Sequence, residues 1–111
     1  MATVALQNQT ESINPTTLFT PSFDGLYVIH VYSTCTTSGG GNAEITLSWT
    51  DDATVQTWSP TSLDLSNQGV YTAGSSFLVK CQGGQSLSYS VSLVELTGSP
   101  TYSLYIAVVT P

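Results

Sequence analysis

A strict alternation of apolar and polar side chains in two segments most constrains the fold. Residues 43–50 read Ala-Glu-Ile-Thr-Leu-Ser-Trp-Thr, and residues 86–93 read Ser-Leu-Ser-Tyr-Ser-Val-Ser-Leu. Successive side chains of a β-strand point to opposite faces, so this period places all the apolar groups on one face. A helix would scatter them around its circumference. The two segments therefore predict strands with one buried face and one hydroxyl-rich face.

Other segments also have the composition of strands, and turn residues separate them. The further candidates are residues 3–7, 16–20, 25–35, 53–58, 62–66, 75–81 and 101–109. Turns are indicated at Asp24-Gly25, Asn67-Gln68-Gly69 and Gly83-Gly84, and no stretch shows helical spacing. Short strands at intervals of about ten residues predict an all-β fold, an antiparallel β-sandwich of jelly-roll type with about eight strands.

The length of 111 residues suits one domain with a two-layer core. We therefore expect a single β-sandwich domain over residues 1–111, in which residues 1–12 could form an extended N-terminal arm. The N-terminus has no basic region followed by an apolar region, so a signal peptide is not expected. No apolar run reaches the roughly 18–20 residues that cross a bilayer, so no membrane segment is expected.

Charge is scarce and almost all of one sign. Charged residues make up 7% of the chain, and seven carboxylates with one lysine give a formal net charge of −6. Binding to nucleic acid or to an anionic membrane needs clustered Lys and Arg, so neither partner is expected. Catalysis needs acids, bases or nucleophiles with neighbours that tune them, and these are largely missing. The composition predicts a protein that is not an enzyme.

The few residues with catalytic or metal-binding chemistry are better explained by structure. His30 lies in the middle of a strand and projects on the same face as Val28 and Tyr32. The adjacent Asp51 and Asp52 follow a strand and suit a turn. Two cysteines and one histidine fall short of a zinc site, and no calcium-binding loop pattern occurs. We therefore predict no catalytic residue, no metal and no cofactor.

Cys35 and Cys81 each stand before a flexible, glycine-rich stretch. That placement is compatible with the same end of a sandwich, where a disulfide would contribute about 3–4 kcal/mol by the chain-entropy estimate. Two buried free thiols are the alternative. We expect the disulfide, because a hydroxyl-rich and lysine-poor composition suits a protein exposed outside a cell.

Two aromatic residues are candidates for contact with a sugar. Trp58 ends a short polar segment, and Tyr71 follows a glycine turn. Exposed aromatic rings can stack on sugar rings while hydroxyl and amide groups fix the orientation. The alternative is that both rings pack in the core or between subunits.

Several strands are apolar on both faces, notably residues 25–33 and 102–109. A sandwich of this size covers only one face of each sheet, so the surplus apolar face predicts contact with other copies of the chain. We expect a homo-oligomer, a trimer or a larger array. The residues expected at the subunit interface are Tyr27, Ile29, Tyr102, Leu104, Tyr105 and Ile106.

Two stretches together resemble the jelly rolls of the C1q/TNF-like family. Residues 18–29 read Leu-Phe-Thr-Pro-Ser-Phe-Asp-Gly-Leu-Tyr-Val-Ile, similar to the approach to a core strand in that family. Residues 84–87, Gly-Gln-Ser-Leu, and the aromatic-rich segment 102–106 are similar to its closing strands. The resemblance implies a jelly roll whose last strand runs along a trimer axis.

The whole chain also resembles short proteins encoded in phage and prophage structural regions. The shared elements are Thr-Leu-Phe-Thr-Pro at residues 17–21, Trp-Thr-Asp-Asp at residues 49–52 and Tyr-x-Leu-Tyr-Ile at residues 102–106. This resemblance implies a virion accessory protein made in the host cytoplasm, such as a capsid decoration or fibre subunit on the virion surface, with a capsid or tail protein as partner. The alternatives are a subunit of an extracellular filament and a carbohydrate-binding module.

Overall fold

A computed structural model describes residues 2–59, 62–69 and 71–111, with their side chains except those of residue 2 and residues 71–75. The described residues form nine strands and no helix. The strands are β1 (Ala2–Gln9), β2 (Ile13–Phe19), β3 (Gly25–Thr37), β4 (Gly40–Asp51), β5 (Thr54–Trp58), β6 (Leu63–Asp64), β7 (Tyr71–Cys81), β8 (Leu87–Thr97) and β9 (Thr101–Val109). Each of the nine segments expected from the sequence contains a strand or overlaps with one, and the smallest overlap is in residues 62–66, where the strand is Leu63–Asp64.

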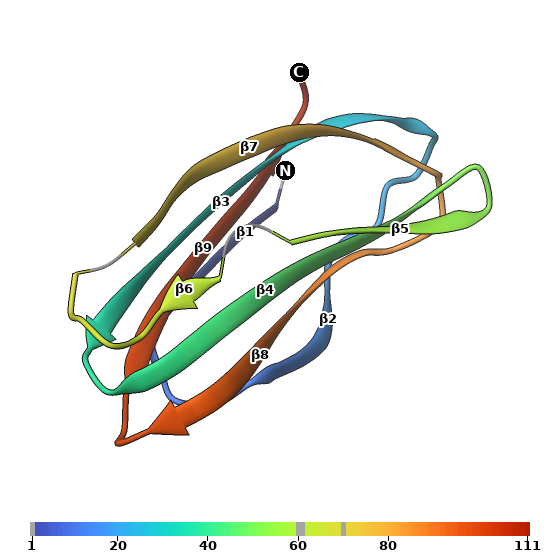
Figure 1. Ribbon diagram of the computed structural model, residues 1–111. Coiled ribbons are helices and arrows are strands. Elements are labelled where there is room, and N and C mark those ends of the chain that lie inside the picture. Colours follow the sequence, from blue (N-terminus) through green and yellow to red (C-terminus); the bar gives the residue numbers. More distant parts are fainter. Residues whose placement is uncertain (1, 60–61, 70) are drawn as a thin grey trace.

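The strands form two antiparallel sheets that pack face to face (Figure 1). Sheet A has the order β1-β9-β3-β7, and sheet B has the order β2-β8-β4-β5 with β6 also paired to β4. The pairs β1·β9, β2·β8, β3·β7 and β4·β5 form one long antiparallel ribbon. The pairs β3·β9 and β4·β8 join successive turns of that ribbon. This rolled ribbon is a jelly roll, which confirms the predicted fold.

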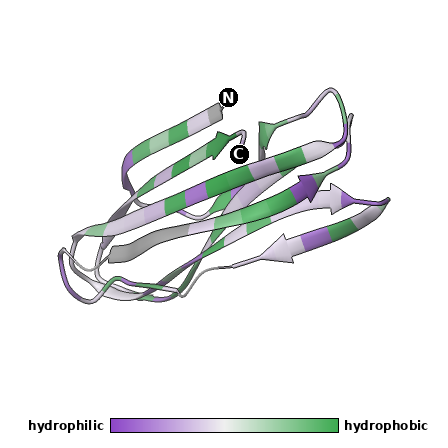
Figure 2. Ribbon diagram, turned by 90° about the horizontal axis from the view of Figure 1, so that it is seen from above, coloured by the Kyte–Doolittle hydropathy of each residue, from purple (hydrophilic) through white to green (hydrophobic). Residues whose placement is uncertain are grey.

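The core lies between the inner faces of the two sheets. It follows from the alternation in the sequence, which Figure 2 shows as changes of colour from residue to residue along the strands. On β4 the apolar Ala43, Ile45 and Leu47 are buried, and the polar residues between them are not. The largest fully buried side chain is Tyr102 of β9, whose hydroxyl donates a hydrogen bond to the Glu11 carbonyl oxygen at 2.8 Å. Burial, and secondarily Tyr89, raise the pKa of Tyr102 to about 12.

The N-terminal segment is part of the sandwich. Residues 2–6 of β1 pair in unbroken register with β9, from Ala2 opposite Val108 to Leu6 opposite Leu104. The register shifts only beyond Leu6, near Asn8, whose φ is 52°. β1 is therefore an edge strand of sheet A.

The predicted disulfide does not form in the structure, where Cys35 and Cys81 are free and buried. Cys81 lies opposite Gly25, at the start of β3. Cys35 is about ten residues further along β3, a separation of about 33 Å at the ordinary rise of a strand. The expectation was wrong because both cysteines lie near the C-terminal ends of their strands. In an antiparallel pair, the C-terminal ends of the two strands lie at opposite ends of the pair. Burial raises the pKa of both thiols.

A two-residue turn joins β4 to β5 at one end of the sandwich. Asp51 pairs with Thr54, and the two residues between them have positive φ, 53° at Asp52 and 62° at Ala53. Two successive positive φ values match the hairpin turn whose twist suits antiparallel strands. The Ala53 amide donates a hydrogen bond to Gln82 Oε1 at 2.7 Å, which connects this turn to the β7–β8 turn.

Candidate functional site

The outward faces of the two sheets differ in chemistry. On sheet B, the outward residues of β4 and β8 form cross-strand pairs such as Thr46 with Ser90 and Ser48 with Ser88. These hydroxyl groups interact well with water. Of the seven large hydrophobic side chains that are exposed among the described residues, four face outward on sheet A, and two, Val55 and Leu96, belong to sheet B. The four on sheet A are Leu26 (50% exposed), Tyr32 (42%), Leu78 (58%) and Val109 (38%).

The register of sheet A places these side chains next to one another. Val28 lies opposite both Leu78 and Val109, which makes one apolar row across three strands. The next row contains His30, and the row after it pairs Tyr32 with Tyr105, whose ring centroids are 6.3 Å apart. We call this surface the outer face of sheet A. It comprises Thr3, Ala5, Leu26, Val28, His30, Tyr32, Ser76, Leu78, Tyr105, Ala107 and Val109.

The outer face of sheet A carries no negative charge. None of the seven carboxylates of the chain lies on β1, β3, β7 or β9 as the structure bounds these strands. The lysine, Lys80, lies at one end of the face, with its Nζ 3.8 Å from Asp51 Oδ1. An acidic chain with a net charge of −6 therefore presents one face from which acidic groups are absent.

A polar pair lies in the middle of this apolar face. A hydrogen bond of 2.6 Å joins His30 Nδ1 and Ser76 Oγ across the β3–β7 ladder. Beside the pair is a shallow groove of about 180 Å³, whose lining includes Thr3, Tyr105 and Ala107. A hydrolytic triad also needs an acid to orient the imidazole and donors for an oxyanion. No carboxylate lies on the strands of sheet A, so the pair has no acid beside it on this sheet.

The structure separates the six residues predicted at a subunit interface. Ile29, Tyr102, Leu104 and Ile106 are buried between the two sheets. They pack inside one copy of the chain, because their side chains point inward at alternate positions of β3 and β9. Tyr27 is half-buried on the inner side, where its ring meets that of Phe19 edge-on at 5.3 Å between centroids. Of the six, Tyr105 lies on the outer face of sheet A.

The sequence reasoning missed the neighbours of these residues, notably Leu26, Leu78 and Val109. β3 and β9 are apolar at both odd and even positions, so alternation alone does not say which set faces the core. The signal that could have decided it is His30. An imidazole is more costly to bury than an aliphatic group, so the residues that share its face are the outward set.

Of the two residues predicted to contact a sugar, Trp58 packs against another aromatic ring of the same chain. Trp58 is half-buried, and its ring packs on Phe77 with centroids 4.1 Å apart. Trp49 also contacts Phe77, at 6.0 Å. These three aromatic rings fill the space between β5 and β7 at the side of the sandwich. The side chain of Tyr71 lies outside the described residues.

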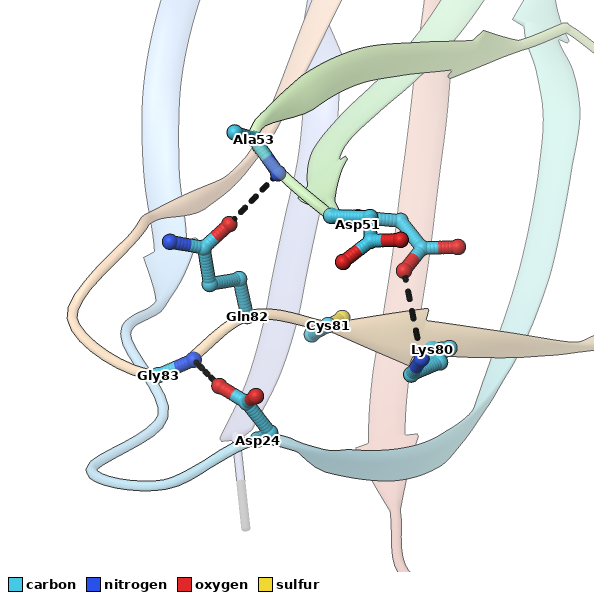
Figure 3. A pocket seen from close by; sticks show the side chains of 8 residues that line it. Asp24, Asp51, Ala53, Lys80, Cys81, Gln82 and Gly83 are labelled. Atoms are coloured by element: carbon cyan, nitrogen blue, oxygen red, sulfur yellow. Dashed lines mark hydrogen bonds and ion pairs between the residues drawn. The ribbon is translucent and has the colours of Figure 1, made fainter.

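A second hollow, of about 320 Å³, lies where the loops meet at one end of the sandwich (Figure 3). Two of its three acidic groups have partners within the fold. Asp24 accepts a hydrogen bond from the Gly83 amide at 2.8 Å, and Asp51 lies near Lys80. No group of three or more metal-ligating side chains was found among the described residues. The arrangement fastens three turns together.

The comparisons with known proteins leave the site to be interpreted from its own geometry. No protein-family model matches the chain, and no curated protein matches it either. Within the described ranges, no helix has the length and apolar character needed to span a membrane.

Proposed function

We propose that this protein is a non-enzymatic structural subunit that self-associates through the outer face of sheet A. The observation that carries the proposal is the contrast between that face and the rest of an acidic chain. The face combines exposed aliphatic and aromatic side chains with a complete lack of carboxylates. Exposed apolar patches of this kind mark sites of association in soluble proteins.

The size of the face approaches that of a specific protein interface. Four strands spaced about 4.8 Å apart and about nine residues long span roughly 19 Å by 30 Å, or about 600 Å² on each copy. Specific protein interfaces bury about 800 Å² per partner. Side chains that project from the sheet add accessible area beyond the flat footprint, so the face approaches that size without help from the loops.

A second copy of the chain is the occupant that the charges favour. Two copies each carry a net charge of −6 and repel each other when their acidic surfaces meet. Glu44, Asp64 and Glu95 belong to strands of sheet B, and Glu11, Asp24 and Asp52 to loops. Contact through sheet A therefore keeps most of the carboxylates away from the junction. Two copies that dock face to face through sheet A form a pair. Of the trimer and the larger array expected from the sequence, the larger array can be built from such pairs, and it is our proposal for the stoichiometry.

The setting that we propose is a virus particle, with the protein as an accessory subunit on the virion surface. The resemblance to phage structural proteins and the jelly-roll topology, which viral capsid domains also use, support it. An extracellular filament would use the same face. A carbohydrate-binding module has less support, because the ring of Trp58 packs on Phe77. Genes for portal, capsid or tail proteins beside this gene would support the virion setting.

Hydroxyl-radical footprinting of dilute and concentrated protein tests the association. We expect labelling of Leu26, Leu78 and Val109 to fall as concentration rises, because association covers them. Val55 provides an internal control. It is 66% exposed and belongs to β5 in sheet B, so its labelling should not change. The proposal would be contradicted if the labelling of Leu26, Leu78 and Val109, like that of Val55, stayed constant as the concentration rises.

A further inference from the structure

We infer that His30 makes this self-association pH-dependent, so that protonation of the imidazole separates the subunits. The inference rests on the proposed function, because it concerns the same face. Its basis is the juxtaposition of the one imidazole of the chain with the middle of an apolar surface whose other charged side chain, Lys80, lies at its end.

His30 lies at the centre of the face in both directions. Across the strands, its row runs from Ser76 on β7 through His30 to Ala107 on β9 and Thr3 on β1. Along β3, it stands between Val28 and Tyr32 on the same side of the sheet. The side chain is exposed in the isolated chain. Any contact that covers the apolar rows on both sides of His30 must also cover the imidazole.

The groups around His30 offer no counter-charge. On β7 the facing group is the Ser76 hydroxyl, and Lys80 lies further along the same strand. On β3 and β9 the nearest titratable groups are the phenols of Tyr32 and Tyr105, and β1 contributes none. A second copy that docks through the same face brings the same groups, with one more imidazole and one more lysine.

Protonation of His30 therefore makes the free energy of association less favourable. A neutral imidazole can enter the contact with Nδ1 already hydrogen-bonded to Ser76 Oγ, which avoids an unsatisfied polar atom at that nitrogen. A charged imidazolium enters an apolar contact at a large desolvation cost unless a carboxylate accompanies it. Histidine is the side chain that ordinarily gains its charge between pH 8 and pH 5, so mild acidification is the relevant signal.

Sedimentation equilibrium of the full chain between about pH 7.5 and pH 5.5 tests the inference. Carboxylates ordinarily stay ionised over this range. We expect the dissociation constant to rise at least about tenfold on acidification. His30→Gln should associate equally at both pH values, and His30→Lys should stay dissociated at both because its charge is fixed.

The outcomes separate this inference from the proposed function. Association with the same affinity at both pH values overturns the role of His30 and leaves the docking face intact. The same pH dependence in His30→Gln as in the unmodified chain also overturns it. A chain that stays monomeric at about pH 7.5 overturns both proposals.

Discussion

Replacing Leu78 with serine should weaken self-association by a calculable amount. Full burial of a leucine side chain is worth about 1.5–3 kcal/mol. Leu78 is 58% exposed in the isolated chain, so covering it contributes about 0.9–1.7 kcal/mol for each copy. A symmetric pair covers two such side chains, which gives about 1.7–3.5 kcal/mol in total. Since about 1.4 kcal/mol equals a factor of ten, Leu78→Ser should raise the dissociation constant about 20- to 300-fold.

Sedimentation velocity over a concentration series measures this change, and Val55→Ser provides the matched control. Val55 is also a large exposed side chain on a strand, at 66%, but it belongs to sheet B. Both variants should keep the free energy of unfolding of the monomer within about 0.5 kcal/mol of the unmodified chain, because both sites are exposed. An unchanged dissociation constant in Leu78→Ser, or an equal weakening in Val55→Ser, would refute the assignment of the docking face.

Two further predictions concern the stability of the fold. Ala53→Gly should raise the free energy of unfolding by about 0.5–1 kcal/mol in urea titrations. The φ of 62° strains an alanine, and the strain that glycine removes exceeds the conformational entropy that glycine adds to the unfolded chain. A loss of stability would contradict the turn geometry. Tyr102, with its pKa raised to about 12, favours the folded state fully below pH 10. Stability should therefore fall by about 2–3 kcal/mol as pH rises from about 10 to 12. If a Tyr102→Phe variant lost the same stability at alkaline pH, the loss would come from other groups and the prediction would be wrong.

The positions of the strands followed from the sequence because alternation and turn chemistry are local signals. Residues 43–50 and 86–93 have one apolar face each, and this alternation predicts which side of sheet B faces inward. The turn at Asp24-Gly25 marks the start of β3 for the same reason. These features depend on neighbouring residues along the chain, and that is why they can be predicted without knowledge of the tertiary structure.

The candidate site was harder to predict because it depends on pairing between distant strands. β3 and β9 are apolar at both parities, so Leu104 and Tyr105 looked equally suited to an interface until the packing assigned them to opposite faces. The cysteines show the same limit. Glycine after Cys35 and after Cys81 marks two strand ends, but only the antiparallel pairing of β3 with β7 shows that these ends lie far apart.

The most direct test of the central claim is the mass of the unmodified chain in solution. Sedimentation equilibrium at about pH 7.5 and up to about 100 µM would measure it where a weak but specific contact is populated. Self-association through sheet A predicts a mass that rises with concentration to a multiple of 11.7 kDa. A mass of 11.7 kDa at every concentration would contradict it.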